Sequence, residues 1–75
     1  PRGRIVHARF AELPPALRRL VLQRLADAAA GRPVPGAARF ADQVAGLHRG
    51  GSRLDLGDGV RAVLEGGVLR AERDV

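Results

Sequence analysis

The side chains that could act as nucleophiles or bases are few and poorly placed for catalysis. The 75 residues include a single serine, Ser52, two histidines and no cysteine. A serine nucleophile needs a base within hydrogen-bond reach, but the Gly50-Gly51 break separates Ser52 from His48. Asp55 and Asp58 are better explained by strand pairing and by a hairpin turn. The chain therefore has no catalytic motif of its own, and the sequence leaves open whether it is part of an enzyme.

Arginine is the one chemically versatile residue that the chain has in abundance. All 13 basic residues are arginine, against 8 acidic ones, and the formal net charge is +5. A guanidinium group binds phosphate through paired hydrogen bonds, and a cationic surface gains affinity for polyanions by releasing counterions. The absence of lysine also fits the codon bias of a GC-rich genome. That bias explains the choice of arginine but not the excess of cations, so both explanations stay in competition.

Eight basic side chains are candidate contacts for a nucleic-acid backbone. They fall on two predicted helices and on the polar face of a predicted sheet. Solvated faces with local ion pairs would explain the same residues, most of all Arg61, which is expected opposite Asp55 and Glu72. The candidates are Arg18, Arg19, Arg39, His48, Arg49, Arg53, Arg61 and Arg70.

Several classes of ligand fit the composition poorly. Phe10 and Phe40 are the only aromatic residues, so stacking on single-stranded bases is not expected, and any contact would read shape and backbone. Without cysteine, two separate histidines make a poor metal-ligand set, so no metal is expected. Arginines interrupt the longest apolar stretches every three or four residues, which argues against a membrane span or a signal peptide. We expect a cytoplasmic chain that is a piece of a larger protein.

Two helices are predicted in the first part of the chain. Proline in the first turn and Gly31 at the end delimit a helix over 14–30. A second helix is predicted over 37–49. Because the link between the two is short, we expect them to form an αα-hairpin. Arg24 should lie within the apolar arc of the first helix, with its stem covering apolar surface or its charge paired with Asp42 or Asp55. That arc, which we expect to be buried, consists of Leu13, Leu17, Leu20, Val21, Leu25 and Ala28.

From Ser52 onward the apolar period changes from helical to alternating. We predict strands over 52–56, 60–65 and 68–73, joined by a three-residue loop at Gly57 to Gly59 and a two-residue loop at Gly66-Gly67. Counting outward from either loop gives the same register, which places Arg53, Arg61 and Arg70 on the polar face. The expected fold is α+β, with a two-helix hairpin packed on a three-stranded antiparallel meander. Residues 1–12 are expected to be a lead-in arm and 13–75 a single domain.

The order of these elements resembles a known family. The segments that carry this resemblance are LPPALRRLVL at 13–22, an alanine-rich helix end, a Gly/Pro break, LDLGDGV at 54–60 and EGGVLR at 65–70. With them the chain resembles the region after the catalytic domain of bacterial tRNA(Ile)-lysidine synthetases. The likeness spans roughly Phe10 to Glu72. The chain departs from the commoner pattern at Gly66, where an aromatic residue often precedes the second turn glycine.

The resemblance implies a function. The family consists of ATP-dependent ligases that adenylate the wobble cytidine of an isoleucine tRNA and attach lysine. This chain lacks the family's Ser-Gly-Gly-x-Asp-Ser loop, so it would be the accessory domain that holds the tRNA, with ATP and lysine bound elsewhere in the parent enzyme and no cofactor in this fragment. Its partners would be isoleucine tRNA and the catalytic domain of the same chain. Arg18 and Arg19 match the helix motif and would contact the tRNA.

Two other functions compete with this one. The chain would instead be an interdomain or protein-interaction packing module if its arginine content is only compositional. A free-standing DNA-binding regulator fits less well, because neither predicted helix has a clear recognition surface and no dimer seam is visible. The first two differ in their expected response to salt, since only phosphate binding weakens steeply as salt rises.

Overall fold

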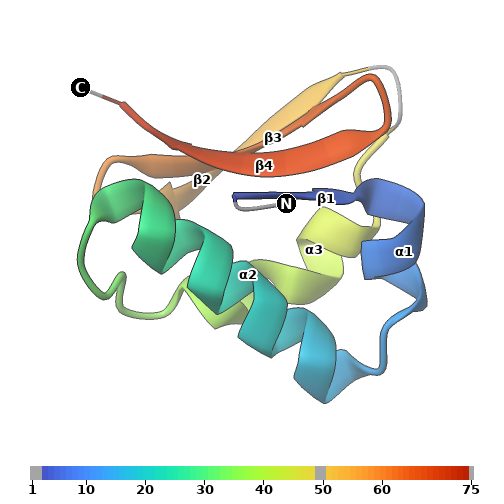
Figure 1. Ribbon diagram of the computed structural model, residues 1–75, viewed down its shortest axis with the longest axis horizontal. Coiled ribbons are helices and arrows are strands. Elements are labelled where there is room, and N and C mark those ends of the chain that lie inside the picture. The colour runs from blue at the N-terminus through green and yellow to red at the C-terminus, as the bar shows by residue number, and fades with distance from the viewer. Residues whose placement is uncertain (1–2, 49–50, 75) are drawn as a thin grey trace.

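The computed structural model describes residues 3–48 and 51–74 and has an α+β architecture (Figure 1). Helices cover one face of a four-stranded antiparallel sheet, with α2 in contact with β3 and β4. The predicted α+β class is confirmed, but the sheet has one strand more than expected. In chain order the elements are β1 Arg4–Val6, α1 His7–Glu12, α2 Pro15–Ala30, the 3-10 helix η1 Ala37–Phe40, α3 Ala41–Ala45, β2 Ser52–Gly57, β3 Val60–Glu65 and β4 Val68–Arg73.

The three predicted strands form with the predicted register over most of their length. Arg61 lies opposite Asp55 on β2 and opposite Glu72 on β4. The prediction is wrong at the first hairpin, where Val60 pairs with Gly57 instead of Leu56 and the ladder is irregular between Asp55 and Gly57. Asp58 and Gly59 have φ angles of 53° and 74°. Positive φ at both central positions is what a tight two-residue turn requires, so the loop is one residue shorter than predicted.

The N-terminal segment, expected to be an arm, contributes a strand and a helix. β1 pairs with β4, so the strand order is β1-β4-β3-β2, and α1 follows β1 without a linker. The Phe10 side chain is fully buried in the core. His7, which lies in the expected arm, is buried, and its Nε2 lies 2.9 Å from the carbonyl oxygen of Val44. Because a carbonyl only accepts, the ring donates this bond and joins α1 to α3.

Helix α2 is rotated from the predicted orientation, so that Val21 and Leu25 of the predicted arc pack only at the edge of the core. Leu22 and Ala26 are completely buried and Ala30 nearly so, whereas Leu17 and Leu20 are each 46% exposed. The three buried residues are spaced by four, and the two alanines are small enough for the helix to lie close to the sheet. The predicted arc failed because α2 is apolar on more than one side, so periodicity alone did not identify the face that meets the sheet.

A polar cluster on α2 fixes the rotation of this helix. Gln23 Nε2 donates to Asp27 Oδ1 at 2.8 Å and to the Val34 carbonyl at 2.7 Å, while Gln23 Oε1 accepts from the Ala38 N–H at 3.1 Å. Asp27 Oδ1 also accepts from the Val34 N–H at 2.8 Å. Val34 is fully buried, so these bonds satisfy backbone groups that water does not reach. The loop between α2 and η1 therefore lies on the face of α2 that carries Gln23 and Asp27.

Removing the Asp27 carboxylate should destabilise this loop. We expect Asp27→Ala to lower the free energy of unfolding by about 1–3 kcal/mol, because the buried Val34 N–H loses its acceptor. Asp27→Asn should lose less, since its amide oxygen can still accept that bond. Urea unfolding followed by circular dichroism measures both. Equal losses of unfolding free energy for the two variants would contradict the role of Asp27 Oδ1 as the acceptor for the Val34 N–H.

The second predicted helix is shorter than expected and has two parts. A single helix over 37–49 was predicted, but η1 and α3 end at Ala45, and Arg49 lies outside the described residues. Gly46 is the physical reason, because glycine disfavours a helix by about 1 kcal/mol relative to alanine. Its N–H closes the last turn on the carbonyls of Asp42 and Gln43.

Candidate nucleic-acid interface

The face of the sheet that points away from the helices carries four arginines. Side chains alternate along a strand, and Ile5, Leu69 and Ala62 point into the core. Their neighbours Arg4, Arg70 and Arg61 therefore point outward, as does Arg53. Figure 1 shows that, within the described part of the chain, no helix crosses this outer face.

Three of these arginines belong to one row that crosses all four strands. Arg4 pairs with Arg70, Arg70 with Val63, and Val63 with Arg53. Val63 is only 2% exposed although it points outward. Its register neighbours Arg53 and Arg70 have long aliphatic stems, which can cover a valine while their charged ends stay in water. We call Arg4, Arg70 and Arg53 the arginine row.

The arginine row has free charge at its two ends. Arg70 in the middle is 3.2 Å from both Glu65 and Glu72. Arg4 and Arg53 are exposed and make no ion pair with any of the described residues. An anion that reaches the sheet would therefore meet Arg4 and Arg53 first, because Arg70 must exchange carboxylate partners to bind it.

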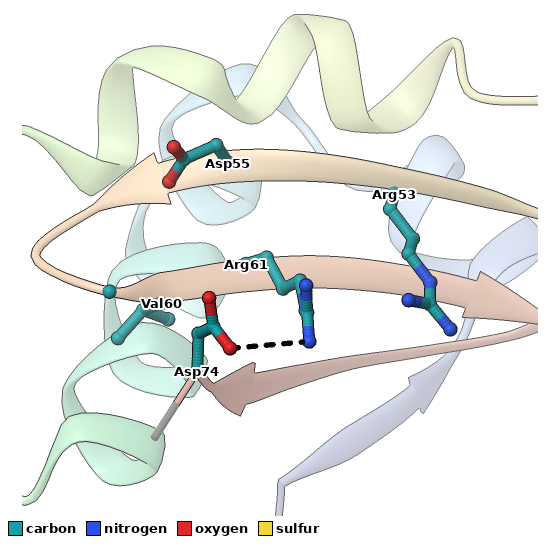
Figure 2. Close-up of a pocket in the computed structure, with 6 residues that line it drawn as sticks. Arg53, Asp55, Val60, Arg61 and Asp74 are labelled. Carbon is teal, nitrogen blue, oxygen red and sulfur yellow. Dashed lines mark ion pairs between the residues drawn. The ribbon is translucent and has the colours of Figure 1, made fainter.

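A hollow lies beside one end of the row (Figure 2). Its volume is about 270 Å³. Arg53 and Asp55 contribute from β2 and Arg61 from β3, and Asp74 closes one side. Arg61 is 3.7 Å from Glu72 and 3.8 Å from Asp74, and its buried Nε has no hydrogen-bond partner in the described structure. Two carboxylates facing two guanidinium groups leave the hollow with little net charge, so Arg53 is its most available cation.

The predicted candidates on the helices lie in the other layer of the molecule. Arg18 has a side chain only 18% exposed, which pairs with Asp42 at 3.1 Å and donates to the carbonyls of Ala11 and Leu13. These bonds tie the junction of α1 and α2 to α3, so this guanidinium has a structural role. Arg19 is exposed on α2, and Arg39 is exposed with its guanidinium 4.8 Å from the Phe40 ring centroid.

The eight predicted candidates are therefore not gathered in one patch. Arg53, Arg61 and Arg70 share the outer sheet face, whereas Arg18, Arg19 and Arg39 lie on the helical side. His48 is exposed beyond the end of α3, and Arg49 is outside the described residues. Arg4, which completes the arginine row, was not among the candidates. A weak local signal lies in the β-branched pair Ile5-Val6, which favours a strand but specifies neither its partner nor its inward face.

Comparisons of this chain with protein-family models, with curated proteins and with solved structures found no match. Within residues 3–48 and 51–74, no three histidine, cysteine or acidic side chains are grouped as a metal site would need. None of the helices in that part of the chain combines the length and the apolar character needed to cross a membrane.

Proposed function

We propose that this chain is an accessory tRNA-binding domain that holds the RNA backbone on its outer sheet face. The observation that carries the proposal is the arginine row on a face without helical cover. Three strand spacings of about 4.8 Å make this row about 14 Å long, enough to reach more than one phosphate. The sequence resemblance to tRNA(Ile)-lysidine synthetases supplies the parent activity in this proposal, a ligase that carries out its chemistry in another domain.

The arrangement of charges suits holding an RNA better than reading its sequence. Guanidinium groups bind phosphate oxygens, which carry no sequence information. Phe10 is fully buried and Phe40 partly so, which leaves little aromatic surface for base stacking. Glu65 and Glu72 hold Arg70, so the bound phosphate must compete with carboxylates. We therefore expect weak binding that depends on salt.

A titration of the chain with isoleucine tRNA and an unrelated tRNA tests the proposal. Neutralising two or three phosphates predicts that the logarithm of the binding constant falls with the logarithm of salt concentration with a slope of roughly −1.4 to −2.7. Preference for the isoleucine tRNA would support the proposed parent enzyme. No binding to either tRNA at low salt would contradict the proposal.

An interdomain packing module is the second candidate function, and a specific observation favours it. Leu17 and Leu20, one turn apart on α2, are each 46% exposed and present apolar surface side by side. Such a surface fits contact with another domain, for which the catalytic domain of the same chain is the proposed partner. A chain with no affinity for RNA at any salt concentration would favour this function.

A further inference from the structure

The outer edge of β1 has backbone groups free to pair with another strand. Opposed residues in an antiparallel ladder alternate between pairs that exchange hydrogen bonds and pairs that do not. The His7 N–H donates to the Gly67 carbonyl at 2.9 Å, so by alternation Ile5 bonds to β4 while Arg4 and Val6 direct their backbone groups away from it. Val6 is the N-cap residue of α1, a position whose carbonyl is engaged by the first bond of the helix. The N–H and C=O of Arg4 and the N–H of Val6 therefore point to the open edge.

An apolar groove runs beside this open edge, between β1 and α2. It has a volume of about 500 Å³, and its apolar lining comes from Ile5 on β1 and from Val21, Leu25 and Ala28 on α2. Arg4 and Arg24 also line it, and neither makes an ion pair with another described residue. The groove therefore combines an apolar floor, unpaired strand edge and two free positive charges.

We propose that β1 is a docking site for an extended, acidic segment of a partner protein, which adds to the sheet as a fifth strand. Addition of a strand to an open edge provides main-chain hydrogen bonds, and alternate side chains then face opposite sides of the sheet. An apolar side chain beside Ile5 enters the groove against Val21 and Leu25. Its neighbours on the strand carry carboxylates, which meet Arg4 on the outer face. A further acidic side chain at the next inward-facing position meets Arg24 at the rim of the groove.

The same features disfavour a second copy of this chain as the occupant. Pairing two β1 strands would bring the Arg4 and Arg24 side chains of two chains, each with a net charge of +5, close together. Like charges on paired strands oppose association.

A labelled octapeptide with glutamate at the outward-facing positions and both valine and glutamate at the inward-facing ones, blocked at both ends, is the probe for this site. Fluorescence anisotropy should show binding, and hydrogen exchange should slow at the amides of Arg4 and Val6. N-methylation of alternate peptide amides should abolish binding in one register, whose amides face β1, and spare it in the other. Protection elsewhere in the chain, or equal tolerance of both methylation patterns, would overturn the proposal.

Charge reversal on α2 provides the matched test of the protein. Arg24→Glu should weaken peptide binding roughly fivefold or more, because an attraction becomes a repulsion. Arg19→Glu changes the charge equally on the same helix but outside the groove, and it should leave peptide binding unchanged. Equal effects of the two substitutions would show that the peptide responds only to the net charge of the chain, and would overturn the docking site. The outcome is independent of the proposed RNA binding, because neither Arg24 nor Arg19 belongs to the arginine row.

Discussion

Replacing Leu22 with alanine is expected to lower the free energy of unfolding by about 2–5 kcal/mol, because the leucine is fully buried in the core between α2 and the sheet. Leu20→Ala removes the same atoms from the same helix, but Leu20 is 46% exposed. Its loss should stay below about 1 kcal/mol. Urea unfolding of the two variants, followed by circular dichroism, measures this contrast.

The comparison of Leu22 with Leu20 distinguishes the observed rotation of α2 from the one that periodicity predicts. Both substitutions change helix propensity equally, so the difference between them reports burial. Leu17→Ala serves as a second exposed control, since Leu17 is also 46% exposed. A larger loss for Leu20→Ala than for Leu22→Ala would show that the predicted arc faces the core after all.

Phe10→Ala is expected to cost about 3–5 kcal/mol, a large part of the stability of a domain of this size. The Phe10 ring is completely buried, although it lies in the segment that the sequence indicates as an arm. Because the alanine variant is expected to be close to unfolding, Phe10→Leu is the more informative substitution, with a loss below about 2 kcal/mol. Chemical denaturation of both variants gives the two values.

Val6→Ala is the matched control for this prediction. Val6 lies in the same N-terminal segment but is 50% exposed, so its truncation should change stability by less than about 1 kcal/mol. If Phe10→Ala were as mild as Val6→Ala, the N-terminal segment would be an arm outside the core. The two values together thus test whether α1 is part of the folded unit.

The strands were predictable because their turns are marked by glycine. Gly66-Gly67 and Asp58-Gly59 fix the hairpins, and strict alternation between them leaves one register that buries the apolar face. β1 was not predictable in the same way, because a strand of three residues is too short to show alternation and its partner β4 lies more than 60 residues away in the chain. The irregular pairing between Asp55 and Gly57 could not be predicted either. It depends on the length of the turn, and the sequence Gly57-Asp58-Gly59 is compatible with both a two-residue and a three-residue loop.

The candidate site was predicted in part for the same reason. The register placed Arg53, Arg61 and Arg70 on one face, and the structure has them there. Arg4 could not be included without β1, although it forms one end of the arginine row. Arg18 shows the opposite failure, because its role depends on the distant Asp42 and on backbone carbonyls of the preceding turn, which no local pattern reveals.

The measurement that tests the proposed function most directly is tRNA binding at low salt by two double variants of equal charge. Arg4→Glu with Arg53→Glu reverses both ends of the arginine row, and Arg19→Glu with Arg24→Glu reverses two exposed arginines of α2. Binding through the outer sheet face predicts that the first pair weakens binding at least roughly tenfold more than the second, with circular dichroism showing that both stay folded. A greater loss for the α2 pair, or equal losses, would contradict it.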